Sequence, residues 1–141
     1  MLGTLAYNTA SAQFVATVEI KEPIEGICNE KAVYALFPMA GQVAAVCKTS
    51  DKEIEKLLNE MPFLKANPKF KGEGMMGIYI NCNGDVVQCK IDNSTGNAEL
   101  DAQIEAVFQK LVYWEVGTLN GKQVDSLRLF SFEIKKGKVT L

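Results

Sequence analysis

The residues of this chain that could do chemistry are its four cysteines, Cys28, Cys47, Cys82 and Cys89. Thiolates attack electrophiles, bind zinc or form disulfides, depending on what surrounds them. The sequence contains no histidine, so a cysteine nucleophile would lack its usual base, and a zinc site would need all four thiolates. There is no C-x-x-C pair. The pattern favours disulfides in an oxidising compartment, with four small buried hydrophobic side chains as the alternative.

A hairpin predicted around Asn83-Gly84 restricts how these cysteines pair. With a two-residue loop, Cys82 and Cys89 lie four positions apart along the ladder, which is about 13 Å. A disulfide requires Cα atoms within about 7 Å, so these two cysteines should not bond each other. If all four cysteines pair, Cys28 and Cys47 must each bond one cysteine of the hairpin.

No other residues have a spacing typical of catalysis or metal binding. The sequence has no glycine-rich phosphate loop, no calcium-loop carboxylates and no recognisable nucleophile motif. We therefore predict no catalytic residues, no metal and no cofactor, and consider an enzyme the least favoured class. A formal net charge of −2 without a basic run argues against nucleic acid and anionic membrane surfaces as partners.

The last seventy residues predict one supersecondary unit. Two strands at Met75–Cys82 and Asp85–Ile91 form a hairpin, in which the last residue of the first strand faces the first residue of the second across a type I′ turn. An amphipathic helix at Ala98–Leu111 follows, and then a returning strand at Val124–Ile134. The hairpin should bury one apolar face, formed by Ile78, Ile80, Val87, Cys89 and Ile91. The helix should cover that face with an apolar stripe of Leu100, Ile104, Val107, Phe108 and Leu111.

The first half of the chain predicts a strand or hairpin followed by a helix. A short strand at Phe14–Ile20 precedes two apolar runs, Ala32–Phe37 and Gln42–Cys47, and the turn-forming residues between the runs favour a second hairpin. Because both runs are rich in alanine, helices are the alternative there. Ser50 begins a capping box for a helix that should end at Pro62.

These elements predict an α+β fold, in which a small antiparallel sheet carries a helix on one face. The polar stretch 62–74 is the expected joint between an N-terminal α+β subunit, residues 13–66, and a C-terminal domain, residues 67–141. Residues 1–12 resemble the remnant of an export signal, because Ala10-Ser11-Ala12 has the small-x-small form that signal peptidase accepts. The mature chain would begin at Gln13; a disordered arm is the alternative. No stretch approaches the ~20 apolar residues that span a bilayer.

The order of motifs in the second half resembles the TonB carboxy-terminal domain family. The resemblance covers residues 67–137 and rests on the run Gly77–Val86, the helix opening Ala98–Asp101, the turn at Leu119–Val124 and the closing strand Leu129–Ile134. It implies a periplasmic or secreted module that binds an extended segment of an outer-membrane receptor as an added strand. The membrane anchor and proline-rich spacer of TonB transducers are not found, so we expect a stand-alone exported form.

The candidate binding site is the edge of the strand Val124–Phe132, because an unpaired strand edge offers free N–H and C=O groups. Leu127 and Leu129 should lie on one face of this strand, and Ser126, Arg128 and Phe130 on the other.

An aromatic patch at Tyr113 and Trp114 is a second candidate recognition surface. The alternatives to peptide binding are an edge covered by the N-terminal segment, a homodimer through sheet edges, a protease inhibitor of the cystatin type and a purely structural domain.

Overall fold

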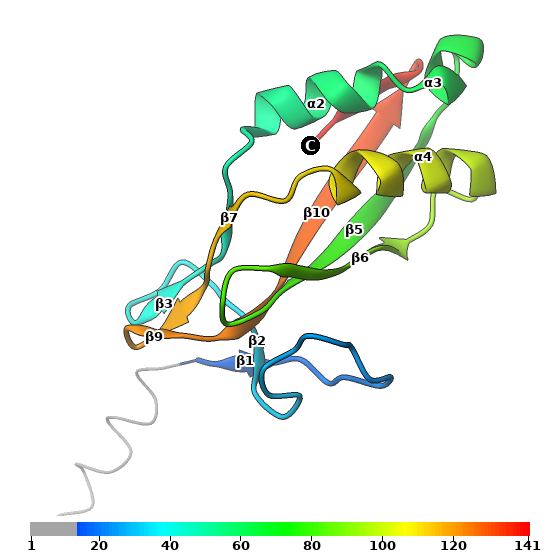
Figure 1. The fold of residues 1–141 in the computed structure, drawn as a ribbon. Coiled ribbons are helices and arrows are strands. Elements are labelled where there is room, and N and C mark those ends of the chain that lie inside the picture. The colour runs from blue at the N-terminus through cyan, green and yellow to red at the C-terminus, as the bar shows by residue number, and fades with distance from the viewer. Residues whose placement is uncertain (1–13) are drawn as a thin grey trace, which may run out of the picture.

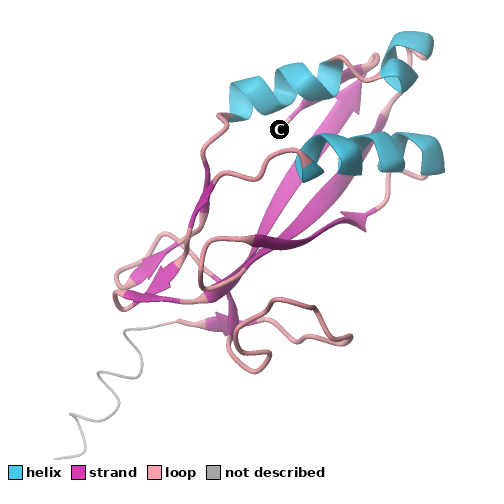
Figure 2. Ribbon diagram, viewed as in Figure 1, coloured by secondary structure: helices cyan, strands magenta, loops and turns pink. Residues whose placement is uncertain are grey.

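The computed structural model describes residues 14–141, so the expected export remnant and the start at Gln13 lie outside the described residues. Within that range the fold is α+β, as predicted, with one large sheet and helices on one of its faces (Figure 2). In spatial order the strands of this sheet are β1 (Ala16–Thr17), β2 (Val33–Ala35), β10 (Asp125–Lys135), β5 (Gly72–Ile80) and β6 (Val86–Asn93), with β11 (Lys138–Thr140) beside the end of β10.

The pairing in this sheet is mixed, whereas the sequence predicts an antiparallel sheet. β10 and β5 run antiparallel over nine paired positions and form the long centre of the sheet (Figure 1). β5 and β6 form the predicted hairpin. β2 is parallel to β10, and this one parallel pair brings the N-terminal segment into the same sheet.

Two smaller sheets pair strands from residues 42–47 with strands from residues 114–123. Their strands are β3 (Gln42–Val43), β8 (Thr118–Leu119) and β9 (Lys122–Gln123) in one sheet, and β4 (Val46–Cys47) and β7 (Trp114–Glu115) in the other. Because β3 pairs with β8 and β4 pairs with β7, residues 42–47 lie beside residues 114–119.

The two longer helices begin where the sequence predicts. α2 (Asp51–Asn59) is capped by the Ser50 side chain, which accepts a hydrogen bond from the backbone N–H of the third helical residue at 3.2 Å. α4 (Ala98–Gln109) is capped in the same way by Asn97 at 2.9 Å. Within residues 14–141, no helix is both long and apolar enough to cross a membrane.

The connector predicted at residues 62–74 contains a helix that the sequence analysis missed. α3 (Pro62–Ala66) begins with the proline that was expected only to end the preceding helix. Proline suits the first helical position, because the N–H that it lacks would have no partner inside the helix. Phe63 and Leu64 are buried, so this segment belongs to the core.

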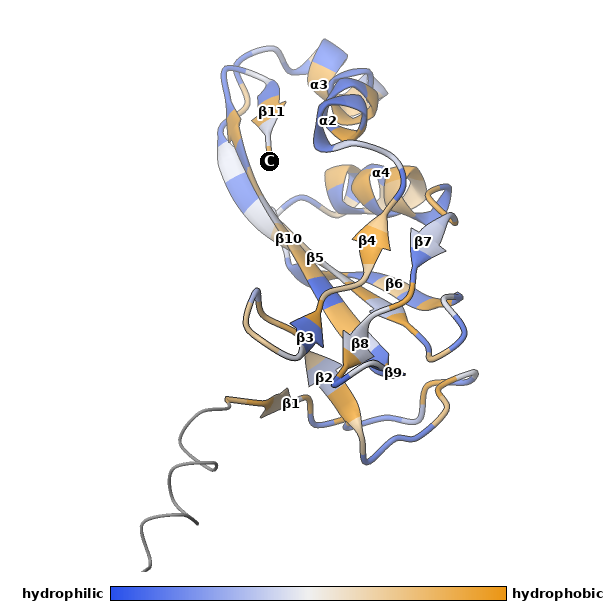
Figure 3. Cartoon of the chain, turned by 90° about the vertical axis from the view of Figure 1, so that its left-hand side faces the viewer, coloured by the Kyte–Doolittle hydropathy of each residue, from blue (hydrophilic) through white to orange (hydrophobic). Residues whose placement is uncertain are grey.

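The core lies between the sheet and the three described helices, which stand on the same side of the sheet (Figure 3). Helix residues from both halves of the chain enter it, namely Ile54 and Leu58 from α2, Phe63 and Leu64 from α3, and Leu100, Ile104 and Phe108 from α4. They meet the sheet residues Met76, Ile78, Ile80, Phe130, Phe132 and Ile134. One hydrophobic cluster therefore spans residues before and after position 66.

The turn of the β5–β6 hairpin differs from the prediction. The Asn81 N–H donates to the Asp85 carbonyl at 2.8 Å, and the Gly84 N–H donates to the Asn81 carbonyl at 2.9 Å, so the loop has three residues instead of two. Only Gly84 has a positive φ there, 87°, whereas a type I′ turn needs two such residues. A bulge then restores the register, and Val86 takes the core position predicted for Val87.

The second hairpin, predicted for Ala32–Phe37 and Gln42–Cys47, does not form. The runs do contain strands, which also rules out the helical alternative, but these strands pair with β1, β10, β8 and β7 and not with each other. Their partners lie mostly in the last third of the chain. A local turn signal carries no information about such distant partners.

Candidate functional site

The candidate edge strand, β10, is paired along one side with β5 but only at its two ends on the other. Asp125 and Ser126 pair with β2, and residues 133–135 pair with β11. Between them, no strand of the described chain pairs with residues 127–132 on that side. We call this unpaired side of residues 127–132 the β10 gap. The predicted edge at Val124–Phe132 is therefore open only in its second part.

The geometry of the β10–β11 hairpin shows which backbone groups face the gap. Its turn at Lys136-Gly137, with φ of 50° and 72°, leaves Lys135 paired with Lys138. In a two-residue hairpin this closing pair directs its N–H and C=O groups at the partner strand, and the direction alternates along the strand. The backbone groups of Ser131 and Leu129 therefore point into the β10 gap.

The side chains of β10 alternate between the two faces as predicted. Leu127 and Leu129 lie on the face away from the helices, and Leu129 is 44% exposed. Phe130 lies on the helix-covered face in the core, and the Arg128 guanidinium carbon is 5.1 Å from the centre of its ring. The gap thus has an apolar side at Leu129 and a cationic side at Arg128.

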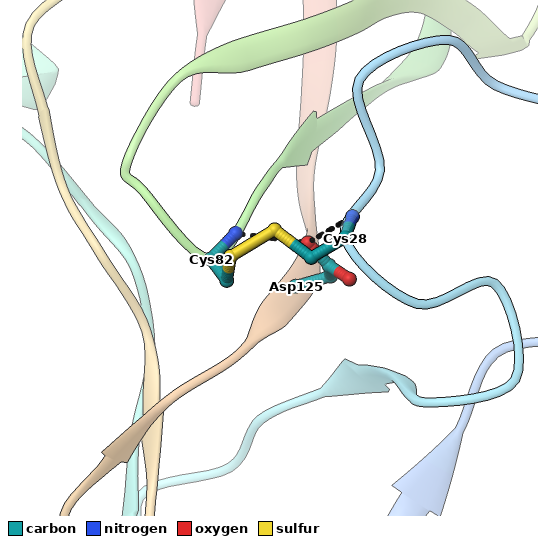
Figure 4. Close-up of side chains that lie close together, drawn as sticks. All are labelled: Cys28, Cys82 and Asp125. Atoms are coloured by element: carbon teal, nitrogen blue, oxygen red, sulfur yellow. Dashed lines mark hydrogen bonds between the residues drawn. A yellow bond between two sulfur atoms is a disulfide. The ribbon is translucent and has the colours of Figure 1, made fainter.

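Asp125, at the β2 end of the gap, joins three segments of the chain (Figure 4). Its side chain is 2% exposed. One carboxylate oxygen accepts from the backbone N–H groups of Cys28 at 3.1 Å and Cys82 at 2.8 Å, and the other accepts from the Asn29 N–H at 2.8 Å. A buried carboxylate requires such partners, so Asp125 serves as a structural joint.

The cysteines form one disulfide. Cys28 bonds Cys82 with a Cα–Cα distance of 6.1 Å, and Cys47 and Cys89 are free thiols. The prediction that the two hairpin cysteines do not bond each other is confirmed, and the hypothesis of small hydrophobic cysteines fits the other two, which pack against the core. Burial, and to a smaller extent the nearby Glu105 carboxylate, raises the pKa of the Cys89 thiol to about 12.

The disulfide and Asp125 form the one cluster of possible metal ligands among the described residues. The sulfur atoms of Cys28 and Cys82 and a carboxylate oxygen of Asp125 lie within 4.8 Å of one another. Metal binding requires thiolates, whereas here the sulfur atoms are bonded to each other and both carboxylate oxygens accept hydrogen bonds. This arrangement supports structure and not metal chemistry.

The predicted aromatic patch is divided between surface and core. Tyr113 is 74% exposed, whereas Trp114 is 8% exposed and lies 6.1 Å from Phe130, measured between ring centres. The Trp114 Nε1–H donates to the Leu111 carbonyl at 2.7 Å, which satisfies its polar atom inside the core. Of the two predicted aromatic residues, only Tyr113 is therefore at the surface.

Sequence reasoning missed β11 and the pairing of β2 with β10, although it predicted a strand within Ala32–Phe37. β11 had a visible signal, because Lys136-Gly137 stands between two runs of alternating residues, as in other two-residue hairpins. The partner of β2 had no such signal, because its pairing with Asp125 and Ser126 joins residues more than ninety positions apart.

Comparison of the chain with protein-family models, curated proteins and solved structures finds no match. The resemblance to the TonB carboxy-terminal domain family therefore rests on the order and spacing of the sequence motifs.

Proposed function

We propose that this protein is a non-catalytic binding module that takes up an extended peptide as an additional strand in the β10 gap. The observation that supports this most strongly is the unpaired stretch 127–132 between two paired ends. Free N–H and C=O groups along a strand edge bind extended chains with little dependence on sequence, and the neighbouring side chains add specificity.

The length of the gap favours a peptide over a second copy of the protein. Six residues of strand span about 20 Å. β10 itself has eleven residues, so a partner β10 lying along the gap would run into β2 at one end or β11 at the other. A flexible segment avoids both by leaving the sheet after a few residues. We therefore infer a linear segment of another protein as the occupant.

The disulfide and the family resemblance indicate where such a module would act and which peptides it would meet. The Cys28–Cys82 disulfide is compatible with an oxidising, extracytoplasmic location. In that location a module resembling the TonB carboxy-terminal domain would meet peptide segments of cell-envelope proteins, including outer-membrane receptors. The antiparallel neighbours β6, β5 and β10 with α4 across them agree with the element order on which the resemblance rests.

A titration with short peptides tests strand addition. The probe is the neutral peptide Gly-Thr-Val-Gln-Val-Thr-Gly, added up to millimolar concentration to ¹⁵N-labelled protein. Strand addition should shift the backbone amide signals of Leu129 and Ser131 most, because their N–H groups point into the gap. If the peptide leaves these signals unchanged while the protein is folded, the proposal is wrong.

Backbone-methylated peptides supply the matched control. One version carries N-methyl groups on the Thr and Gln residues, and the other carries them on the two Val residues. In an extended strand only alternate N–H groups face the gap, so one version should lose binding and the other should keep it. Equal binding of both versions would mean that side chains, and not the strand edge, hold the peptide.

A further inference from the structure

Arg128 is the only charged side chain of β10 that lies on the helix-covered face, and its charge has no partner there. Its Nε atom is buried and makes no hydrogen bond to the described residues. Within residues 14–141 no carboxylate lies within salt-bridge distance of it, since the ion pair found there joins Lys135 and Glu133. Residues 1–13 contain no Asp or Glu that could supply one. A partly buried guanidinium with an unsatisfied N–H is an unfavourable arrangement.

Arg128, with its unpaired charge and unsatisfied N–H, lies at the β10 gap. It is the second residue of the open stretch 127–132, and on the β5 side its neighbour is the buried, apolar Ile78. On the other side no strand of the described chain is present. Stacking against Phe130 holds the guanidinium beside the sheet. A residue of an added strand opposite Arg128 would place its Cβ about 4.5–5.5 Å from the arginine Cβ.

We propose, on the basis of the strand addition inferred above, that the β10 gap selects peptides in which one acidic residue stands between two apolar residues. The carboxylate of the acidic residue pairs with Arg128 and accepts from its unsatisfied N–H. The two flanking residues point to the opposite face of the sheet, beside Leu127 and Leu129. The pattern apolar–acidic–apolar reads the same in both strand directions, so it holds for a parallel or an antiparallel peptide.

The test compares three peptides that differ only at the centre, Gly-Thr-Val-X-Val-Thr-Gly with X as Glu, Gln or Lys. The Gln amide oxygen and the Glu carboxylate can both accept from Arg128, but only the carboxylate adds the attraction between opposite charges and can accept two parallel hydrogen bonds from the guanidinium. The Glu peptide should therefore bind about tenfold more tightly than the Gln peptide. The Lys peptide should bind more weakly than both, and added salt should reduce the difference between Glu and Gln.

Two variants of Arg128 assign the preference to this residue. Arg128→Gln should bind the Glu and Gln peptides equally, and Arg128→Glu should prefer the Lys peptide. Melting curves of both variants show whether they fold. If neither folds, the peptide comparison on the unchanged protein still decides the question, because it needs no substitution.

The outcomes separate this inference from the proposed function. If the Glu and Gln peptides bind the unchanged protein equally, or if a folded Arg128→Gln protein keeps the preference for Glu, the selection by Arg128 is refuted while strand addition stands. If none of the three peptides shifts the Leu129 and Ser131 amide signals, strand addition itself fails.

Discussion

Removal of the Asp125 carboxylate should destabilise the joint between the N-terminal segment, the β5–β6 loop and β10. The carboxylate accepts three backbone hydrogen bonds, and bonds to a charged group contribute roughly 1.5–3 kcal/mol each, or about 4.5–9 kcal/mol together. Cys28 and Asn29 are exposed, so water can replace part of the hydrogen bonding that their N–H groups lose. We therefore expect Asp125→Ala to lower the free energy of unfolding by about 2–4 kcal/mol.

Asp125→Asn should have a smaller effect for a geometric reason. The amide oxygen can take the place of the carboxylate oxygen that accepts from Cys28 and Cys82, but its NH₂ group would then face the Asn29 N–H. Two neutral bonds remain and one is lost, so the expected cost is about 1–2 kcal/mol. The matched control is Asp85→Asn, an exposed aspartate that closes the β5–β6 loop, which should change stability by less than about 0.5 kcal/mol.

Urea denaturation followed by circular dichroism measures these differences, provided that the m-value stays constant. The disulfide closes a loop with a sequence separation of 54, which in the chain-entropy model contributes about 4 kcal/mol. The disulfide holds two of the segments that Asp125 joins. Asp125→Ala should therefore lower the free energy of unfolding more in a protein that also carries Cys28→Ser and Cys82→Ser than in the unchanged protein. Additive costs would contradict this coupling, and an Asp125→Ala protein as stable as the unchanged one would refute the role of Asp125.

Three further predictions concern the core, the free thiols and acid stability. Phe108→Ala should cost about 3–5 kcal/mol in urea denaturation because its side chain is 1% exposed, whereas Gln109→Ala beside it should stay within about 0.5 kcal/mol; equal small effects would mean that α4 is not docked on the sheet. Iodoacetamide should modify Cys47 well before Cys89 in the native protein, because burial raises the Cys89 pKa to about 12; peptide mapping that finds equal rates would contradict this. Burial alone would raise the pKa of Asp101, but hydrogen bonds from Ser94 and Thr95 outweigh burial and hold that pKa below its ordinary value. The ionised carboxylate therefore stabilises the fold at pH values above the ordinary aspartate pKa. This contribution disappears as the pH falls through the lowered pKa of the folded state. The stability difference between the unchanged protein and Asp101→Asn should therefore be largest at neutral pH and shrink as the pH falls below the ordinary aspartate pKa, and a difference independent of pH would exclude this origin.

The parts of the fold that the sequence predicted depend on signals within a few residues. The caps at Ser50 and Asn97, the helix stripe around Phe108 and the alternation along β10 all follow from local spacing, and the structure confirms each of them. Local signals were less reliable for turn types. Asn83-Gly84 was expected to form a two-residue turn, whereas Asn120-Gly121, with φ of 52° and 81°, forms one.

The candidate site was predictable only in part, because its limits depend on contacts between distant segments. The sequence indicated a strand at Val124–Ile134 and the alternation of its side chains. An edge covered by the N-terminal segment was one of the alternatives, and the pairing of β2 with the start of β10 confirms it for that end only, whereas β11 at the other end was not predicted. Asp125 was equally inconspicuous, because a carboxylate at the start of a strand usually faces solvent, and its burial becomes visible only when Cys28 and Cys82 are brought beside it.

Amide hydrogen exchange along β10 tests the central claim most directly, because it reports on each backbone N–H of the gap. In the free protein, the Leu129 and Ser131 amides should exchange fast while Phe130 and Phe132, whose backbone groups face β5, exchange slowly. With a saturating peptide in the β10 gap, all four amides should exchange slowly. Slow exchange of Leu129 and Ser131 in the free protein, or fast exchange when the peptide is bound, would contradict strand addition at this site.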